Sequence, residues 1–423
     1  MRGGIFMELW HIRGGNRLEG ACFVQGSKNA SLPILAAAIV YPVRVELQNV
    51  PRLRDVDAAL RILRHLGCTA EQRGGDVYID STTLSGSDIP HALMEEMRSS
   101  VIFMGALIAR CGQASLTLPG GCQLGKRPID LHLSALREMG ADIEEDRGEI
   151  CCRASRLRGT ELELPFPSVG ATENIMLAAC AAEGETVIHG AAREPEITAL
   201  QGFLRAMGAE CSGAGTETVR VSPRRARERV SWRVAPDRIV ASTLACACAA
   251  AGGDVELRGI EPQQFSTVLH FLNRAGCDII SSDRSVRVRT DRRLKAPGEI
   301  VTAPYPGFPT DAQPVLMAAL LRSRGLTRIT ETIFENRYRQ VPELCRLGAD
   351  ITVSGRVAEI WGVERLQGTA LTATDLRGGA AMIVAGLSAE GETLLFDEGH
   401  VTRGYERFDM RLRALGADIC LED

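Results

Sequence analysis

Residues 63–68 read LRHLGC, and the chain repeats this phrase five more times, as LREMGA (136–141), LRAMGA (204–209), LNRAGC (272–277), LCRLGA (344–349) and LRALGA (412–417). Each copy closes a helix-like run with Leu-x-x-x-Gly, and successive glycines lie 68 to 73 residues apart. A period this regular predicts a fold built from six copies of one structural unit. Residues that break the repeat are therefore the candidates for function.

A second shared element precedes each glycine phrase, and it is apolar around most of a helix circumference. Its copies are NASLPILAAAIV (29–40), SSVIFMGALIARCG (99–112), TENIMLAACAAEG (172–184), ASTLACACAAAGG (241–253), DAQPVLMAALLRSRG (311–325) and GGAAMIVAGLSAEG (378–391). A helix without a polar face must be buried on every side. The other helices keep charges on one face, as in RDVDAALRILRHLG (54–67), so we expect them to be half exposed.

Each glycine phrase is followed by alternating polar and apolar residues around a turn, as in DITVSGRVAEIWG (350–362). This pattern predicts antiparallel strands with one exposed face. We therefore expect an α/β fold with buried helices inside and sheets outside, the reverse of a barrel whose strands form the centre. A chain of 423 residues exceeds what one core usually supports, so we expect two domains with a boundary near 226–236.

Composition excludes several classes of protein. The net charge is −4, and no dense Lys and Arg run stands out beyond RRARER (224–229), which favours a solvated linker or strand edge over a nucleic-acid site. The 13 cysteines lack zinc-like pairing, so we expect a reduced, cytoplasmic protein with buried thiols. The start, MRGGIFMELW, has no long apolar stretch, and no segment reaches the ~18 apolar residues of a membrane span.

The first candidate for chemistry is GSKNASLPILAA (26–37), where Lys28 and Asn29 directly precede a buried helix. A helix N-terminus already favours anions through its free N–H groups. An equally good interpretation is that Asn29 caps the helix and Lys28 is a solvated side chain.

The second candidate is TLPGGCQLGKRPIDLH (117–132), whose proline and glycines predict a loop. Cys122 is expected to be exposed there, with Lys126 and Arg127 close enough in sequence to lower its thiol pKa. We therefore favour Cys122 as an acid, base or nucleophile over an ordinary buried cysteine.

The third candidate is APYPGFPTDAQ (303–313), which delivers Asp311 to the start of the fifth buried helix. Asp311 is either a helix cap or a general base for a substrate hydroxyl. A set of arginines also recurs near the ends of the buried helices, and it predicts convergence on an anion because guanidinium binds phosphate or carboxylate in a bidentate manner. This set consists of Arg98, Arg337, Arg377 and Arg403.

Common cofactor motifs are missing from the sequence. It contains no GxxxxGKS/T loop, no GxGxxG after a strand and no HExxH, and its seven histidines show no metal-ligand spacing. We therefore expect no metal and no cofactor, and chemistry on an anionic small molecule.

The motifs taken together resemble the UDP-N-acetylglucosamine enolpyruvyl transferases of the EPSP synthase superfamily. The resemblance rests on GSKNASLPILAA, PGGCQLGKRPIDLH, FPSVGATENIMLAA, AAREPEI, YPGFPTDAQ, TIFENR, DLRGGAA and RGYE, in order along nearly the whole chain. It implies an inside-out α/β barrel fold with three βαβαββ repeats in each of two domains and an active site in the cleft between them. The implied domains are 28–234, and 1–27 together with 235–423.

The resemblance also implies a reaction and its residues. The enolpyruvyl group of phosphoenolpyruvate would pass to the 3′-hydroxyl of UDP-N-acetylglucosamine with release of phosphate, the first committed step of peptidoglycan synthesis. Phosphoenolpyruvate would be held by Lys28, Arg127 and Arg403. The same cleft would be lined by Arg98, Arg337 and Arg377. Cys122 would be the lid cysteine that protonates the methylene carbon or assists product release and that fosfomycin alkylates. Asp311 would take the hydroxyl proton, and Asn29 would support the tetrahedral intermediate. The UDP sugar would contact Arg127, Pro128, Ile129, Asp130, Leu131, Ser168, Val169, Gly170 and Ile333.

Two residues depart from the pattern of these transferases. Val240 stands where glutamate is expected, which predicts a weaker ion pair at the start of the fourth unit. Thr402 stands where aspartate usually precedes the arginine, and we expect this change to loosen the positioning of Arg403.

Two alternative functions follow from the same motifs. A shikimate-pathway enolpyruvyl transferase would carry Lys-Ser at 28–29 and would lack the loop with Cys122. A non-catalytic regulator that binds UDP sugars would not need both Cys122 and Asp311. We expect small-molecule substrates, no nucleic acid or membrane partner, and a monomer or weak homo-oligomer.

Overall fold

The computed structural model describes residues 7–97, 99–117, 129–146 and 148–422, and these residues form two compact units. The continuous unit contains residues 26–235, with the gaps just named. The discontinuous unit contains residues 7–25 and 236–422. Among the described residues, no helix is both long and apolar enough to span a membrane.

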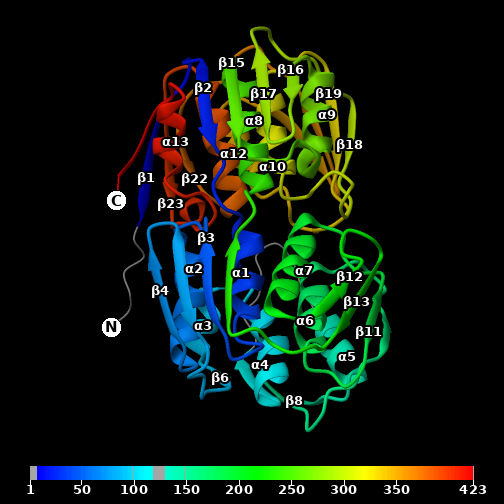
Figure 1. Cartoon of the computed structure of the whole chain (residues 1–423). Helices are drawn as coiled ribbons and strands as arrows, with labels where there is room; N and C mark the ends of the chain where they lie inside the picture. Colours follow the sequence, from blue (N-terminus) through cyan, green and yellow to red (C-terminus); the bar gives the residue numbers. More distant parts are fainter. Residues whose placement is uncertain (1–6, 98, 118–128, 147, 423) are drawn as a thin grey trace. The chain divides into compact units, whose positions relative to one another are not determined.

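The continuous unit holds seven α-helices and twelve strands among its described residues (Figure 1). The helices are α1 (Lys28–Ala37), α2 (Arg54–His65), α3 (His91–Glu96), α4 (Phe103–Cys111), α5 (Asp130–Glu138), α6 (Val169–Ala179) and α7 (Pro195–Met207). The strands are β3 (Arg44–Gln48), β4 (Thr69–Arg73), β5 (Asp76–Asp80), β6 (Asp88–Ile89), β7 (Gln113–Thr117), β8 (Asp142–Asp146), β9 (Glu149–Arg153), β10 (Glu161–Glu163), β11 (Thr186–His189), β12 (Glu210–Ser212), β13 (Thr218–Ser222) and β14 (Arg229–Arg233).

The described part of the discontinuous unit, 7–25 and 236–422, repeats this organisation with six α-helices and twelve strands. The helices are α8 (Arg238–Ala251), α9 (Ser266–Ala275), α10 (Gln313–Leu320), α11 (Val341–Arg346), α12 (Leu376–Leu387) and α13 (Phe408–Ala414). The strands are β1 (Glu8–Arg13), β2 (Leu18–Phe23), β15 (Gly253–Arg258), β16 (Asp278–Ser281), β17 (Ser285–Thr290), β18 (Glu299–Val301), β19 (Leu326–Thr330), β20 (Asp350–Ser354), β21 (Val357–Trp361), β22 (Ala370–Thr372), β23 (Glu392–Asp397) and β24 (Asp418–Glu422). Short 3-10 turns are η1 (Ser100–Ile102), η2 (Pro262–Phe265) and η3 (Val401–Arg403).

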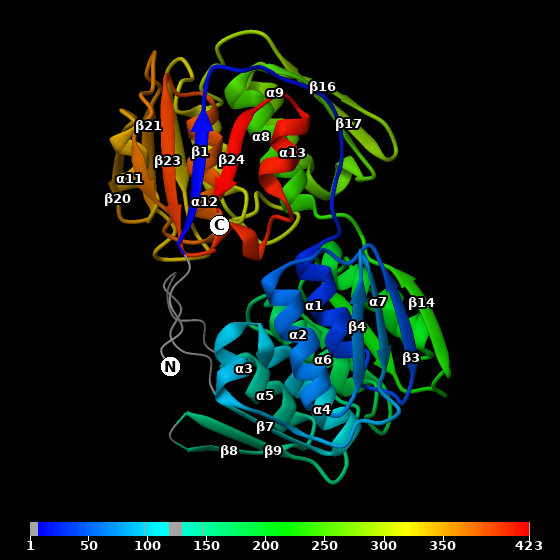
Figure 2. The same ribbon diagram turned by 90° about the vertical axis from the view of Figure 1, so that its left-hand side faces the viewer.

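The strands described above form six four-stranded sheets that share one pattern. One edge strand runs parallel to its neighbour, and the other two adjacent pairs in each sheet are antiparallel. The orders are β14-β3-β5-β4, β6-β7-β9-β8, β10-β11-β13-β12, β16-β17-β15-β2, β18-β19-β21-β20 and β22-β23-β1-β24. The sequence-distant strand β1 lies between β23 and β24 (Figure 2), and β2 lies beside β15. The N-terminal segment thus completes two sheets of the discontinuous unit.

The apolar helices form the interior of each unit, as predicted. In the discontinuous unit α8, α10 and α12 pack against one another with the sheets around them (Figure 1), and every residue of α10 is buried. In the continuous unit α4 packs against α1 and α6. By contrast α2 exposes one face, because its charged residues recur on that side. The prediction of buried helices with sheets outside is therefore confirmed.

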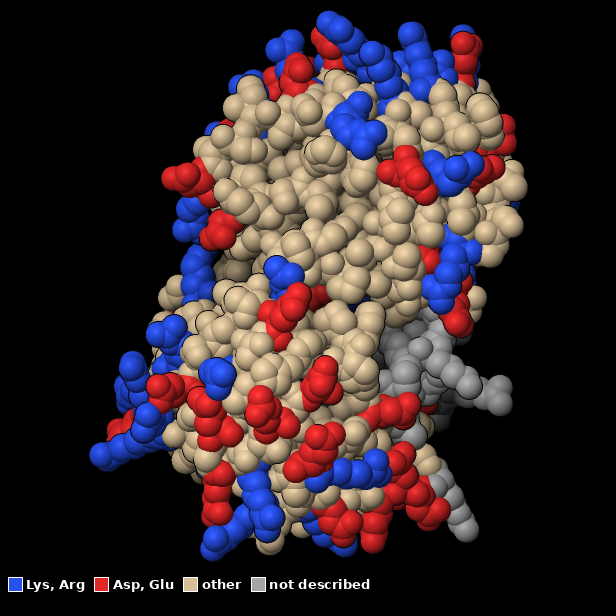
Figure 3. All heavy atoms as spheres, turned by 90° about the vertical axis from the view of Figure 1, so that its right-hand side faces the viewer, with Lys and Arg blue, Asp and Glu red and all other residues tan. Residues whose placement is uncertain are grey.

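The face drawn in Figure 3 carries charges of both signs, as is usual for a globular protein. The run RRARER has a structural explanation, because Arg229 begins the edge strand β14. Neighbouring Arg224 is held by Glu210 in a surface ion pair. Residues 224–228 form an irregular, mostly exposed segment between β13 and β14, so the interpretation of this run as a solvated linker or strand edge agrees with the structure.

Candidate active site

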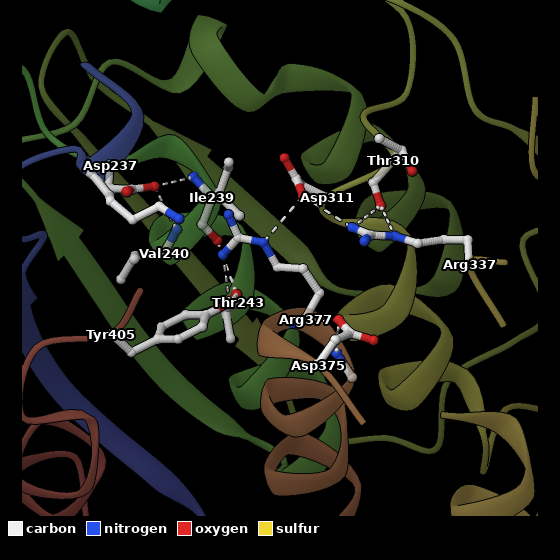
Figure 4. Close-up of polar contacts among 12 residues, drawn as sticks. Asp237, Ile239, Val240, Thr243, Thr310, Asp311, Arg337, Asp375, Arg377 and Tyr405 are labelled. Atoms are coloured by element: carbon white, nitrogen blue, oxygen red, sulfur yellow. Dashed lines mark hydrogen bonds and ion pairs between the residues drawn. The ribbon is translucent and has the colours of Figure 1, made fainter. Parts of the chain in front are cut away.

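Asp311 is the meeting point of two arginines in the discontinuous unit (Figure 4). Arg337 Nη2 lies 3.0 Å from Asp311 Oδ1, and Arg377 Nε lies 3.2 Å from the same oxygen. Arg337 is fixed further because its Nε and Nη2 donate to the carbonyl oxygen of Thr310, at 3.2 and 3.0 Å. Two arginines of the predicted set therefore converge on a carboxylate of the protein itself.

The local sequence explains how Asp311 reaches this position. The residue before the first turn of α10 is Ala312, which makes no side-chain cap, and Pro314 occupies the first turn. Asp311 therefore does not cap its helix, and the interpretation of a capping carboxylate is wrong. Its side chain is 35% exposed, whereas those of Arg337 and Arg377 are 2% and 6% exposed. Of the three groups, the carboxylate is the one that a ligand can reach.

Arg377 is almost fully buried, and it is held in place by Asp311 and Tyr405. Burial acts to lower its pKa, but the Asp311 carboxylate, followed by Tyr405 and Asp237, raises the pKa above the ordinary value of an arginine. Its Nη1 donates to the Tyr405 hydroxyl at 3.3 Å, and its guanidinium lies 5.8 Å from the centre of the Tyr405 ring. The Tyr405 hydroxyl also lies 2.9 Å from Thr243 Oγ1. Arg377 is therefore a charged group in a fixed orientation.

The starts of α8 and α12 frame this cluster, and an aspartate caps each of them. Asp237 accepts from the amides of Ile239 and Val240 at 2.8 and 3.1 Å. Asp375 caps α12 by accepting from the amides of Arg377 and Gly378. These caps satisfy amides that a helix start otherwise leaves without partners.

The two departures from the transferase pattern occupy different surroundings. The Val240 side chain is fully buried in the apolar core, so a glutamate there would bring a carboxylate into that core. Thr402 lies in η3 directly before Arg403, and its hydroxyl donates to Glu8 Oε1 at 2.9 Å. The Thr402 side chain is therefore anchored, and looser positioning of Arg403 stays a prediction.

In the continuous unit, Lys28 begins α1 as an ion-paired residue. Its Nζ lies 3.3 Å from Asp55 Oδ2, and the two side chains are 13% and 4% exposed. Ser27 caps the helix by accepting from the Ala30 amide, so the interpretation of Asn29 as the cap is wrong. The sequence placed Lys28 at a helix start but missed Asp55, its buried partner in the first turn of α2.

The starts of α5 and α6 meet through a histidine that the sequence interpretation overlooked. His132 Nδ1 lies 2.7 Å from Asn174 Nδ2, while Asn174 Oδ1 accepts from the Gly105 amide at 2.7 Å. Because the amide nitrogen donates to Nδ1, the His132 proton sits on Nε2. Burial lowers the pKa of His132 to about 4, so the ring is neutral at pH 7.

Gly170 packs directly against this ring at the N-terminus of α6. A Cβ atom at Gly170 would lie 3.0 Å from His132 Cε1 and 3.2 Å from Nε2. Ser168 caps α6 by accepting from the Ala171 amide at 3.4 Å. The predicted contact residues 129–131 and 168–170 therefore belong to two neighbouring helix starts.

Several predicted residues lie elsewhere or outside the description. Ile333 follows β19, and its amide donates to Glu331 Oε1 at 2.8 Å. The predicted residues Arg98, Cys122, Arg127 and Pro128 lie outside the described residues. In the ranges that the structure describes, no group of three or more His, Cys, Asp and Glu side chains could hold a metal ion.

Comparison with known proteins now identifies the family. The model of the family described as EPSP synthase (3-phosphoshikimate 1-carboxyvinyltransferase) matches residues 12–412. UDP-N-acetylglucosamine 1-carboxyvinyltransferase 2 of Caldanaerobacter subterraneus subsp. tengcongensis is 46% identical over 413 residues, which cover 98% of this chain and 99% of that protein. The chain belongs to the UDP-N-acetylglucosamine 1-carboxyvinyltransferases. UDP-N-acetylglucosamine 1-carboxyvinyltransferase of Geotalea uraniireducens is 44% identical over 413 residues, with 98% and 99% coverage.

Solved structures agree with the fold of this 1-carboxyvinyltransferase. The enolpyruvyl transferase NikO from Streptomyces tendae superimposes with a TM-score of 0.87 at 26% identity, covering 98% of this chain and 99% of that chain. EPSP synthase from Acinetobacter baumannii superimposes with a TM-score of 0.75 at 20% identity, covering 99% and 100%. The predicted family and the predicted inside-out α/β fold are both confirmed.

Proposed function

We propose that this 1-carboxyvinyltransferase transfers the enolpyruvyl group of phosphoenolpyruvate to the 3′-hydroxyl of UDP-N-acetylglucosamine and releases phosphate. The relatives at 44–46% identity over almost the whole chain carry the name of this activity. The observation that supports it most directly is the partly exposed Asp311 carboxylate held by two buried arginines. The product enters the synthesis of peptidoglycan precursors.

Asp311 is the proposed base for the sugar hydroxyl. The hydroxyl oxygen adds to the central carbon of phosphoenolpyruvate while the methylene carbon gains a proton, which gives a tetrahedral adduct. Loss of a proton from the resulting methyl group and cleavage of the carbon–oxygen bond to phosphate then restore the double bond. Because Arg337 and Arg377 bond to one oxygen of Asp311, the carboxylate has a fixed direction when the hydroxyl proton is transferred.

Cations are the proposed ligands of the phosphate and carboxylate of phosphoenolpyruvate. We assign Lys28, Arg127 and Arg403 to this role, with Arg98, Arg337 and Arg377 nearby. Fixed positive groups stabilise the charge that develops in the adduct. Asn29 is the proposed support of the adduct, and Cys122 is the proposed proton donor to the methylene carbon or helper in product release. We assign residues 127–131, 168–170 and 333 to the UDP sugar.

The proposed substrates are cytoplasmic metabolites, so we place the reaction in the cytoplasm, with the protein as a monomer or weak homo-oligomer. No cofactor is needed for addition and elimination, because the proposed proton transfers use side chains alone.

A coupled phosphate assay tests this proposal. Phosphate should be released from phosphoenolpyruvate in the presence of UDP-N-acetylglucosamine, but not without a sugar nucleotide or with shikimate 3-phosphate as the acceptor. Binding of UDP-N-acetylglucosamine without phosphate release would make the protein a regulator, and release with shikimate 3-phosphate would assign it to the shikimate pathway.

The Asp311→Asn variant tests the role of the base in the same assay. It should lower kcat by about 10²- to 10⁴-fold with little change in sugar-nucleotide binding, since general base catalysis contributes factors of that size. Asp283→Asn, in the hairpin between β16 and β17, is the matched control. An equal loss of turnover and binding in Asp311→Asn would contradict the proposed base.

A further inference from the structure

The turn that carries Arg403 is tied to the N-terminal segment on both sides of that residue. Thr402 Oγ1 donates to the Glu8 carboxylate at 2.9 Å (Oε1) and 3.2 Å (Oε2). On the other side, Gln25 Nε2 donates to the Gly404 carbonyl oxygen at 3.2 Å. These contacts link positions separated by almost the whole length of the chain.

Gln25 uses both ends of its amide on this turn. Besides donating to Gly404, its Oε1 accepts from the Glu406 amide at 2.9 Å, so the side chain bridges the two neighbours of Tyr405. The main chain of Gln25 also accepts from the Asp237 amide at 2.8 Å, which ties the same residue to the cap of α8. A glutamate at position 25 would have the same shape but would lack the N–H donor, and an alanine there would lack both the donor and the acceptor.

Both anchors are buried, which makes their hydrogen bonds costly to lose. Glu8 is 6% exposed and Gln25 is 4% exposed. A buried polar group that loses its partner keeps the full cost of leaving water. The start of the turn is fixed separately, because Asp397 accepts from the amides of His400 and Val401 at 2.8 and 2.9 Å.

We propose that Glu8 and Gln25 are positioning residues that hold Arg403 and Tyr405 for catalysis. This inference rests on the proposed function, in which Arg403 binds phosphoenolpyruvate. A long arginine side chain is precise only when its backbone is fixed, and the two anchors fix residues 402 and 404. Through Tyr405, the same turn also sets the hydroxyl that orients Arg377 on Asp311.

The Thr402 departure fits this arrangement. An aspartate at position 402 would place its carboxylate against that of Glu8, whereas the threonine hydroxyl donates to it. Thr402 and Glu8 are therefore a matched pair in this chain.

Kinetics of paired variants test the proposal. Thr402→Val keeps the shape and removes the donor, while Thr402→Ser keeps the donor. We expect the KM for phosphoenolpyruvate to rise about tenfold in Thr402→Val and Gln25→Glu, with Thr402→Ser near the unmodified value. The KM for UDP-N-acetylglucosamine should change little, whereas the Tm should fall in Thr402→Val and Gln25→Glu, because each variant removes a hydrogen bond of a buried group. Thr352→Val, on the exposed side of β20, is the control.

Hydrogen exchange supplies a readout that does not require turnover. In Gln25→Ala, amides of the turn at 401–407 should exchange about tenfold faster, while those of β17 are unchanged. An unmodified protein without phosphate release contradicts the proposed function, whatever the exchange result. Unchanged kinetics in an active protein, or unchanged exchange in the turn, would overturn the positioning role. An equal rise of the KM values for both substrates would overturn it as well.

Discussion

Arg377 lies between Asp311 and Tyr405, and its guanidinium donates to both: Nε to the carboxylate at 3.2 Å and Nη1 to the phenol oxygen at 3.3 Å. Thr243 contacts the same phenol oxygen at 2.9 Å. Because the Tyr405 hydroxyl is buried, its direction is set by these two partners. The orientation of the proposed base thus depends on a residue that does not touch it.

The Tyr405→Phe variant tests this dependence. Loss of the hydroxyl removes one contact of Arg377 and one of the two contacts of Thr243, which still donates to the Ile239 carbonyl oxygen at 2.9 Å. The unfolding free energy should therefore fall by about 1–2 kcal/mol. We expect kcat for phosphate release to fall about tenfold, because Arg377 loses part of its orientation. Tyr78→Phe, on the exposed face of β5, is the control. Unchanged kcat would show that the hydroxyl does not orient Arg377.

The buried pair of Lys28 and Asp55 predicts a large loss of stability when one partner is removed. In Asp55→Asn the largely buried Lys28 ammonium loses the Asp55 charge, so the unfolding free energy should fall by about 3 kcal/mol. Chemical denaturation at pH 7 measures this change. The exposed pair of Arg328 and Glu359, 48% and 36% exposed, supplies the control, because Glu359→Gln should cost below about 1 kcal/mol. Equal effects of the two variants would contradict a special role for burial.

The sequence predicted the repeat and its layers because burial of a helix is encoded locally. A segment such as α10, apolar on all sides, has no other stable position than an interior. The position of β1 between β23 and β24 could not be predicted from the local sequence pattern, because strand pairing depends on segments far apart in the chain.

The candidate site was predictable only in part, for a similar reason. The proline-rich loop before Asp311 pointed to this residue in the sequence. Its role, however, depends on Arg337 and Arg377, which are 26 and 66 residues away. Asp55 and His132 were missed because a charged or polar residue on an amphipathic helix looks exposed until its neighbours are known. One signal was available for Asp55, which lies among the apolar positions of α2 rather than opposite them.

His132 predicts a component of stability that depends on pH. Its pKa is about 4 in the folded protein and 6.5 ordinarily, so the unfolded chain binds the extra proton first. Stability from the neutral ring is therefore complete above pH 6.5 and is lost as the pH falls toward 4. Between pH 7.5 and pH 5 the loss should amount to about 2 kcal/mol. In His132→Gln, the free energy of unfolding measured with urea should differ between pH 7.5 and pH 5 by about 2 kcal/mol less than in the unmodified protein. An unchanged difference would contradict the assignment.

Gly170→Ala separates packing from helix propensity at the proposed UDP-sugar contacts. Alanine normally stabilises a helix by about 1 kcal/mol relative to glycine. Here the new methyl group would lie 3.0 Å from His132 Cε1, so the start of α6 or the ring must move. We therefore expect lower stability and an approximately tenfold higher KM for UDP-N-acetylglucosamine, with the KM for phosphoenolpyruvate less affected. Gly75→Ala, where a Cβ atom meets no atom within 4 Å, is the control. If the Gly170→Ala variant were more stable and its kinetics unchanged, the N-termini of α5 and α6 would tolerate movement. Their spacing would then not matter for binding of the UDP sugar.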